Sequence, residues 1–408
     1  MNVKVNESLS LKIKKSFGLT IVWLPVVACL LRGEVAKAQP FGSWIDVKAE
    51  CGAVGDGKAD DTVAIQKGLD LIRPEDSKRK VLYFPAGTYR ITGTVKAIRE
   101  KHRECQGVGL QGEGPDQSVI VYDGAGNEPM LQWGAWYSTI RSLGFVSADS
   151  EAARLRLGLR EDKLAKPSAG IWFGPEFSTA NEVSDCAFRD LPIGIQGGTD
   201  KTKGQAEVAL EQCKFERCEI GLLLGNWNSL DWWLWDCVFQ DCGLGVSNSP
   251  GCGNFNVYRS RFGGSTRSDL KIGNLGGFAF VGNESDGAER FLYVQRGNTA
   301  GANITIQGNR ISGAKYEEKM PSGVVAQGLS IRLGNPGPVL MLDNEFSRPT
   351  GATGADVYFN SANDIVPRGS ALLMGNTTTG SSLYEAEKNY EVRVIENGEM
   401  SDGIKMKM

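Results

Sequence analysis

The sequence predicts an all-β solenoid, a fold in which each repeat of the chain forms one coil. Composition is the first observation: the 408 residues include 52 glycines and 15 prolines, which indicates many turns between short strands. The second is a repeat made of two short strand-like runs around a turn, with no helix between copies. A formal charge of -3, without basic patches, does not favour nucleic acid as a partner.

The repeat is clearest between residues 182 and 272. Its first cysteine position, taken by Cys186, Cys213, Cys237 and then Ser260, recurs after 27, 24 and 23 residues. The aligned segments are EVSDCAFRDLPIGIQ from Glu182, ALEQCKFERCEIGLLL from Ala209, WLWDCVFQDCGLGVS from Trp233 and NVYRSRFGGSTRSDLKI from Asn256. Weaker copies begin at Ile304 and Val339. A period of this length with strands is typical of a solenoid.

Stacking of coils predicts which residues face inward. Equivalent positions in successive coils lie about 4.8 Å apart, so one inward position becomes a ladder of like side chains. We expect three ladders: Phe188, Phe215, Phe239 and Phe262; Cys186, Cys213 and Cys237; and Leu191, Cys218 and Cys242. Buried cysteine behaves as a small apolar residue, so these ladders are interpreted as interior packing. A disulfide between Cys218 and Cys242 is conceivable at this spacing but is not required.

The N-terminal segment has the layout of a secretory signal. Lysines near the start precede the apolar run FGLTIVWLPVVACLL, and RGEVAKA ends in small residues before Gln39. This predicts a signal peptide over residues 1–38 and a secreted or periplasmic product. A second interpretation is a lipoprotein box ending at Cys29, which would anchor the product through a lipid.

Because His102 is the only histidine and no Cys-x2-Cys pair occurs, zinc is not expected.

The segment after the signal carries specific motifs. The segment WIDVKAECGAVGDGKADDTVAIQKGLDLI contains Gly55-Asp56-Gly57 and Asp60-Asp61-Thr62, and VLYFPAGTYRI contains Pro85-Ala86-Gly87-Thr88-Tyr89; GVGLQGEG follows. This run resembles the opening of pectate-lyase-superfamily (pectin-lyase-like) proteins. The resemblance implies a single-stranded right-handed parallel β-helix with an N-terminal capping helix, whose first turn Asp60 or Asp61 can cap. It divides the mature chain, residues 39–408, into cap and first coils at 39–95, main coils at 96–347 and irregular C-terminal coils at 348–408.

The resemblance implies a functional class and not a reaction. Related β-helix proteins include polysaccharide lyases, glycoside hydrolases, epimerases and phage tailspikes, and a shared fold does not fix the chemistry. The Asn-Thr-Asp, Gly-His-Gly and Arg-x-Lys motifs of polygalacturonase-like hydrolases are missing, as is the Arg-x-Pro-x-x-Arg pattern of pectate-lyase-like enzymes. The site therefore has to be argued from the strands themselves.

Alternation along the strand before each cysteine predicts an exposed strip. Because Val183, Leu210, Leu234 and Val257 are expected to face inward, their neighbours face outward. The outward residues with functional chemistry are Glu182, Glu211, Trp233, Trp235 and Tyr258. Aromatic faces suit sugar rings, and a pair of carboxylates suits glycoside hydrolysis. One coil and two residues separate Glu182 from Glu211, which predicts about 8 Å between their backbones, within the range of inverting hydrolases. Ordinary solvated glutamates are the alternative.

A second strip competes with the first. Glu219 directly precedes a strand that begins with Ile-Gly. Nearby, Asp190, Arg217 and Asp241 are expected to stack at one register. These residues form either a catalytic site or a surface ion-pair network. Arg267, Asp269 and Lys271 extend this edge, where Arg267 and Lys271 could contact an anionic substrate.

The segment GNWNSLDWWLWDC suggests where a ligand binds. It places Trp227, Trp233 and Trp235 outward and Trp232 inward, and exposed tryptophans of this kind mark a binding site or subunit contact.

We therefore expect an exported protein that acts on a polysaccharide, most simply a glycoside hydrolase with Glu182 and Glu211 as acid and base and Glu219 and Asp241 in reserve. A polysaccharide lyase acting on a uronic-acid polymer, with calcium, and a non-catalytic glycan-binding or surface β-helix remain alternatives. The expected partner is the polysaccharide, with no cofactor for a hydrolase, no membrane span, and a monomer or a homotrimer.

Overall fold

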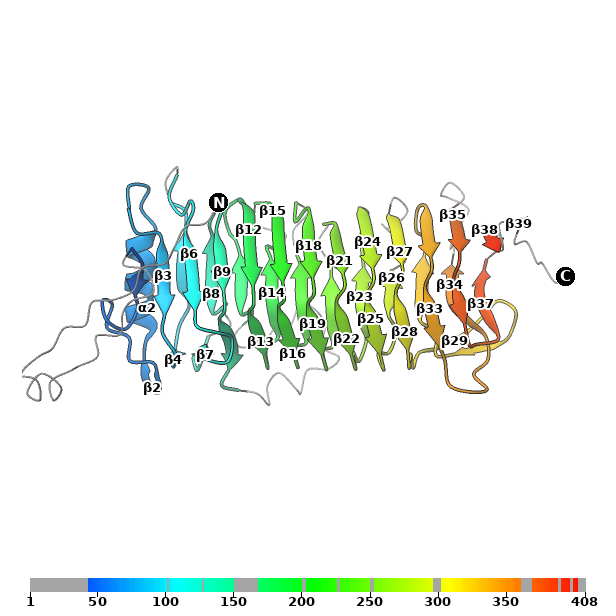
Figure 1. Ribbon diagram of the computed structural model, residues 1–408, viewed down its shortest axis with the longest axis horizontal. Coiled ribbons are helices and arrows are strands. Elements are labelled where there is room, and N and C mark those ends of the chain that lie inside the picture. Colours follow the sequence, from blue (N-terminus) through cyan, green and yellow to red (C-terminus); the bar gives the residue numbers. More distant parts are fainter. Residues whose placement is uncertain are drawn as a thin grey trace, which may run out of the picture. The chain divides into compact units, whose positions relative to one another are not determined.

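The chain folds into a parallel β-helix from Ser43 onward, with its coils stacked in sequence order (Figure 1). This computed structural model describes residues 43–100, 103–126, 128–149, 168–199, 203–225, 228–249, 253–295, 302–360, 369–387, 390–396 and 399–402. The predicted signal segment, including Cys29, and Trp227 lie outside these residues. The architecture confirms the parallel β-helix expected from the repeat.

Three long sheets form the walls of the solenoid, and we call them A, B and C. In the described ranges, sheet A contains β1 Ile45–Asp46, β3 Val81–Phe84, β6 Gly109–Gly112, β9 Thr139–Arg141, β12 Ser178–Ser184, β15 Gln205–Glu211, β18 Trp232–Trp235, β21 Phe255–Tyr258, β24 Gly277–Val281, β27 Asn303–Gln307, β32 Val339–Leu342, β35 Ser370–Met374, β38 Glu391–Glu396 and β39 Glu399–Asp402. Sheet B contains β2 Asp56–Asp60, β4 Gly87–Ile91, β7 Ser118–Tyr122, β10 Gly144–Ser147, β13 Ala187–Arg189, β16 Lys214–Glu216, β19 Val238–Gln240, β22 Arg261–Gly263, β25 Glu284–Asp286, β28 Arg310–Ser312, β33 Glu345–Ser347 and β36 Thr377–Thr378. Sheet C contains β5 Val95–Ile98, β8 Leu131–Gly134, β11 Ile171–Phe173, β14 Ile193–Gly197, β17 Ile220–Leu224, β20 Leu244–Ser247, β23 Ser268–Ile272, β26 Leu292–Val294, β31 Ile331–Gly334, β34 Ala355–Asn360 and β37 Ser382–Ala386.

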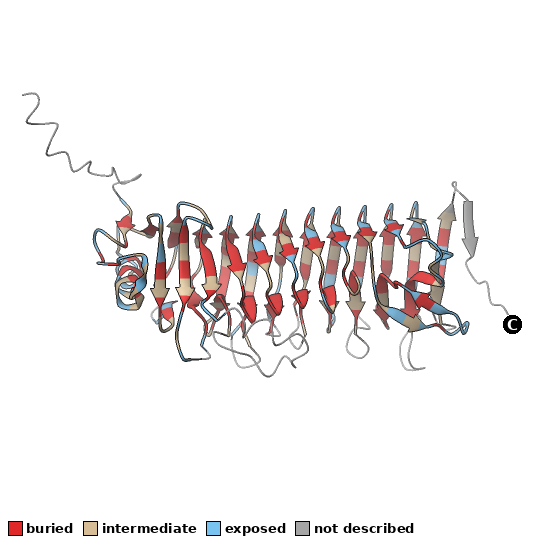
Figure 2. Cartoon of the chain, turned by 90° about the horizontal axis from the view of Figure 1, so that it is seen from below, coloured by how far each residue is buried: buried red, intermediate tan, exposed pale blue. Residues whose placement is uncertain are grey.

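Each full coil runs through the three sheets in the order A, B, C. In one coil, for example, β12 is followed by β13 and β14, and each of these pairs in parallel with the equivalent strand of the next coil. The turn between the A and B strands is short, since only Asp185 and Cys186 separate β12 from β13. Figure 2 shows buried residues along the strands of every coil, with exposed residues gathered at the turns.

The predicted helix is present as α2, Thr62–Ile72, beside the first strands at the N-terminal end of the solenoid (Figure 1). Its buried side consists of Ile65, Gly68, Leu69 and Ile72. The two candidate caps have different roles. Asp60 accepts a hydrogen bond from the Thr62 backbone N–H at 3.1 Å. Asp61 is buried and accepts from the backbone N–H groups of Val54 (2.7 Å) and Gly55 (3.0 Å), so it fixes the glycine-rich turn instead of the helix.

The phenylalanine ladder forms as predicted. The rings of Phe188, Phe215, Phe239 and Phe262 are fully or almost fully buried and stack with centroid separations of 5.0, 4.7 and 4.8 Å. Glycines of sheet C make room for them: a Cβ on Gly221 would lie 2.7 Å from the Phe239 ring. The phenylalanines therefore fix both the coil spacing and the small residues opposite.

The cysteine ladders also face the interior. All five repeat cysteines, Cys186, Cys213, Cys218, Cys237 and Cys242, are buried and free, so the Cys218–Cys242 disulfide is absent from this structure. Burial raises the pKa of the Cys186 thiol to about 12. The first ladder occupies the A–B turn directly after a residue with positive φ, such as Asp185 (49°) or Asp236 (54°).

Further along the chain, the same turn position changes from cysteine to serine and asparagine. The later occupants are Ser260, Asn283, Asn309, Asn344 and Asn376. The Asn309 side chain accepts from the Asn283 backbone N–H at 2.9 Å and donates to the Phe280 carbonyl at 2.9 Å. This asparagine ladder joins successive coils through side-chain amides.

Two short antiparallel pairings lie outside this plan. The strands β29, Glu317–Lys319, and β30, Val325–Gln327, form a hairpin, and β38 pairs in antiparallel fashion with β39. Within the described part of the chain, no helix is long and apolar enough to cross a membrane.

Candidate functional site

The outer face of sheet A carries the residues that the alternation predicted. Glu182 pairs in register with Ala209, which pairs with Trp233 and then with Asn256. In the second outward column, Ser184, Glu211, Trp235 and Tyr258 follow one another. We call Glu182, Glu211, Trp233, Trp235, Asn256 and Tyr258 the sheet A strip.

The aromatic rings of the strip form one continuous stack. Trp233 and Trp235 lie 6.3 Å apart between ring centroids at 19°, and Trp235 and Tyr258 lie 5.8 Å apart at 15°. All three are partly exposed, whereas Trp232 is fully buried, as predicted. Its indole N–H donates to the Gln205 carbonyl at 3.2 Å. The strand thus divides its tryptophans between the core and a solvent-facing aromatic surface.

The two glutamates of the strip have different surroundings. Glu182 is held by Arg141 of β9, whose Nη2 lies 2.9 Å from Oε1 and 3.0 Å from Oε2. Glu211 is exposed, and its carboxylate has no hydrogen-bond or ion-pair partner among the described residues. Sequence reasoning missed Arg141, because its coil has Leu143 in place of the cysteine that aligned the others, although Phe145 keeps the phenylalanine position.

The reserve carboxylates lie on the edge between sheets B and C, away from the tryptophans. Glu219 is 6% exposed and its Oε1 lies 2.5 Å from Arg267 Nη2. Asp190 receives two hydrogen bonds from Arg217, at 2.7 and 2.9 Å. The predicted Asp190–Arg217–Asp241 stack is thus only partly formed, since Asp241 is exposed and accepts from Gln240 at 3.0 Å.

The predicted cationic edge is also divided. Asp269, expected at this edge with Arg267 and Lys271, is fully buried, and its carboxylate accepts a 2.5 Å hydrogen bond from the Ser285 hydroxyl. Burial raises the pKa of Asp269 to about 7. Lys271 lies on β23 of sheet C, so neither predicted cation shares a face with the tryptophans. The prediction that Asp269 is exposed was wrong, because Asp269 occupies the inward position that Gly245 holds one coil earlier.

A second polar cluster, on the later part of sheet C, was not predicted. Arg332 binds Glu318 of the hairpin through hydrogen bonds of 2.8 and 3.0 Å. Arg290 lies 3.4 Å from the centroid of the Tyr316 ring and 4.9 Å from that of Tyr293. These contacts attach the β29–β30 region to sheet C.

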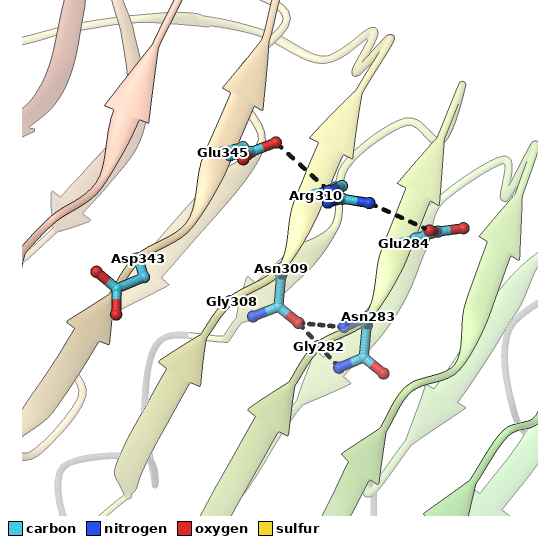
Figure 3. Close-up of a pocket in the computed structure, with 8 residues that line it drawn as sticks. All are labelled: Gly282, Asn283, Glu284, Gly308, Asn309, Arg310, Asp343 and Glu345. Atoms are coloured by element: carbon cyan, nitrogen blue, oxygen red, sulfur yellow. Dashed lines mark hydrogen bonds and ion pairs between the residues drawn. The ribbon is translucent and has the colours of Figure 1, made fainter.

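A shallow pocket of about 370 Å³ lies at the A–B edge of the later coils (Figure 3). Gly282 and Gly308 leave this edge without side chains, and Arg310 sits between Glu284 and Glu345, 3.9 and 3.5 Å away. Asn283 and Asn309 of the ladder form its floor (Figure 3). The pocket lacks aromatic side chains, which separates it from the sheet A strip.

Comparisons with known proteins agree on the fold. Residues 44–134 match the family described as rhamnogalacturonase A/epimerase, pectate lyase-like. A comparison with curated proteins found no match. Among solved structures, a tailspike of an Acinetobacter phage matches with a TM-score of 0.61 at 13% identity, over 91% of this chain and 66% of that one. The chain therefore spans just under two thirds of that tailspike.

Two enzymes also share the fold at low sequence identity. The A-module of a mannuronan C-5 epimerase from Azotobacter vinelandii matches with a TM-score of 0.56 at 16% identity, over 86% of this chain and 93% of that module. The catalytic unit of an α-1,3-glucanase from Streptomyces thermodiastaticus matches with a TM-score of 0.52 at 15% identity, over 88% and 69% of the two chains.

Proposed function

We propose that this chain, a pectate-lyase-like parallel β-helix protein, acts on a polysaccharide held along the outer face of sheet A. The observation that carries the proposal is the stack of Trp233, Trp235 and Tyr258 beside the exposed, unpartnered Glu211. Aromatic faces of this kind pack against the apolar faces of sugar rings. The solved structures that share the fold include proteins named for action on mannuronan and on α-1,3-glucan.

The strip suits a chain-like ligand better than a single small molecule. Its residues come from four neighbouring strands, β12, β15, β18 and β21, so the surface extends along the solenoid. Partly exposed aromatic groups in a contiguous row are uncommon on a monomer surface unless they bind something. A polysaccharide can contact several coils at once, and several weak contacts made together raise the overall affinity.

Glycoside hydrolysis is the catalytic form of the proposal. Glu182 and Glu211 lie on adjacent strands, offset by one coil and two residues, which corresponds to about 8 Å between their backbones. Side chains placed at this backbone separation can reach the distance of about 6.5–9.5 Å that separates the two carboxyl groups of inverting hydrolases. Glu211, exposed and free of partners, suits the base that activates water. Glu182 would be the acid, and Arg141 has to swing away or be displaced by substrate before Glu182 can donate a proton.

Non-catalytic binding is the second candidate, and the Arg141–Glu182 pair favours it. Both oxygens of Glu182 already face one guanidinium nitrogen, an arrangement that holds a carboxylate in place and offers no proton. The aromatic stack needs neither glutamate to bind a glycan. A lyase remains the third form, and it would require a base and a neutralising cation such as calcium at the strip.

The test is to incubate the purified protein with neutral and uronic polysaccharides and to measure both retention and products. New reducing ends without ultraviolet absorbance would support hydrolysis, reducing ends with the absorbance of unsaturated products would indicate a lyase, and retention alone would indicate binding. Trp233→Ala and Trp235→Ala should each weaken retention about tenfold or more. If both variants retained every polymer as well as the parent, the strip would not be the site.

A further inference from the structure

We infer that the sheet A strip takes a neutral polysaccharide and discriminates against uronic-acid polymers. This inference rests on the proposed function and adds the substrate class. It comes from the charges around the aromatic stack: the described arginines on this face are bound to carboxylates, while several carboxylates have no cationic partner.

The two arginines beside the strip are already engaged. Arg141 holds Glu182 at 2.9 Å. Arg259, at the A–B edge next to Tyr258, makes hydrogen bonds of 3.0 and 2.8 Å to the carboxylate of Asp236. An arginine that pairs with a carboxylate in this way presents little net charge to a ligand. Neither group is therefore a free receptor for a uronate.

Carboxylates without a cation surround the same stack. Glu211 is exposed within it, and Asp185 at the A–B edge accepts only from the Ser142 hydroxyl, at 2.9 Å. On the C–A side, Glu207 accepts from the Thr179 hydroxyl at 2.8 Å and Asp231 from the Asn254 amide at 2.7 Å. These partners are neutral, so the carboxylates keep their negative charge facing the ligand.

Other described cations near the strip are paired or belong to other sheets, and Arg261 on β22 of sheet B pairs with Glu284 at 3.8 Å. Lys203, at the C–A corner, pairs with Glu176. Lys214 lies on β16 of sheet B, beyond the A–B turn, and Lys271 lies on sheet C. Like charges that face one another at a binding surface weaken association and suppress the wrong partner, most strongly at low salt. A neutral glycan keeps the aromatic contacts and avoids this repulsion.

The experiment compares two forms of one polymer. A soluble neutral β-glucan or α-glucan that the protein retains is oxidised at its primary hydroxyl groups to uronate, and both forms are titrated against the protein at low and high ionic strength. We expect oxidation to weaken binding about tenfold or more at low salt, with a smaller difference at high salt. The double variant Asp185→Asn, Glu207→Gln should narrow the difference at least about threefold while leaving binding of the neutral form unchanged.

Controls separate this inference from the proposed function. Trp233→Ala should weaken retention of the neutral polymer about tenfold or more, whereas Leu340→Ala, at the same outward column of β32, should leave it unchanged. If the oxidised polymer bound as tightly as the neutral one, and Trp233→Ala weakened binding of both, the strip would be a glycan site without the proposed selectivity. If no polymer bound at all, the proposed function would fail and the inference with it. Circular dichroism of each variant identifies any that do not fold.

Discussion

One column of the solenoid is filled in two chemically different ways. In the earlier coils, the position after the positive-φ residue of the A–B turn is Cys186, Cys213 or Cys237, and in the later coils it is an asparagine. The Cys213 thiol reaches only one backbone carbonyl, that of Val183, at 3.4 Å. Asn309 donates to a carbonyl and to the next asparagine and accepts from the preceding one. The backbone is the same, but the thiols make only long contacts with carbonyls, such as 3.6 Å from Cys186 to Ile140, whereas the amides bond one coil to the next at 2.9 Å. We call the earlier coils the packed half and the later coils the bonded half.

The difference shows that a stacked coil constrains the size and depth of a residue more than its polarity. A thiol fills the turn as a small apolar group, and a weak S–H donor leaves little to satisfy. An amide in the same place is tolerated only because every N–H and carbonyl of the ladder finds a partner, since a buried unsatisfied group costs about 1–3 kcal/mol. The two halves should therefore respond differently to the same kind of substitution.

The largest effect is expected in the packed half. Phe215→Ala removes a ring stacked between Phe188 and Phe239 and should lower the free energy of unfolding by about 3–5 kcal/mol, measured by urea denaturation. Phe215→Leu, which keeps most of the volume, should cost less than half as much. Equal losses from both variants would show that stacking of the rings, and not filled volume, stabilises this half.

Asp269 should make stability depend on pH. Its pKa is raised to about 7 from 3.8 because it is buried, so the folded state keeps a proton that the unfolded state has lost between about pH 4 and pH 7. Stability should therefore fall as the pH rises through this window, by up to about 4 kcal/mol. Asp269→Asn should flatten this dependence, whereas Asp241→Asn, at an exposed position, should leave it unchanged. A parent protein with equal stability at both ends of the window would contradict the prediction.

Breaking the bonded half should cost somewhat less. Asn309→Ala removes the amide that satisfies the backbone N–H of Asn283 and the carbonyl of Phe280, and should destabilise by about 3 kcal/mol. Asn303→Ala is a matched control in the same coil, because that side chain is exposed. Thermal unfolding of the two variants gives the comparison, and similar melting temperatures would refute a stabilising role for the ladder.

The smallest effect on stability is expected from replacing a cysteine of the A–B turn with a serine. Cys213→Ser places a hydroxyl where Ser260 stands two coils later, and Ser260 accepts from the Cys237 backbone N–H at 3.1 Å. A serine at 213 can donate to the Val183 carbonyl, so the loss should be about 1 kcal/mol or less. A loss as large as that of Phe215→Ala would mean that the earlier coils cannot accept polarity in this column.

Periodic residues made much of the fold predictable. The phenylalanine and cysteine positions set the register, and that register correctly placed Glu211, Trp233 and Trp235 as outward neighbours. The asparagine ladder had a readable signal that was missed: Asn283, Asn309, Asn344 and Asn376 each follow a glycine or aspartate at the A–B turn. With that signal, the register would have extended into the later coils.

Other features depend on contacts that spacing does not encode. Arg141 reaches Glu182 from a coil 41 residues earlier in the chain, which has Leu143 where the later coils have cysteine. Asp269 looked like part of an exposed charged edge, yet it replaces a glycine in the interior and is compensated by a serine of the following coil. The polar cluster on sheet C requires the β29–β30 hairpin, which interrupts the repeat.

The short A–B turn also determines where the chain can accept inserted residues. Two residues separate the A and B strands in coil after coil, from β9 and β10 to β35 and β36, whereas the B–C and C–A corners differ widely in length. The interval between β28 and β31, for example, accommodates the whole hairpin. Between β9 and β36, the length variation that can reshape a binding surface is thus confined to the two corners that flank sheet C. The sheet A strip can gain a rim on one side only, and its A–B side stays open to long, unbranched or branched chains alike.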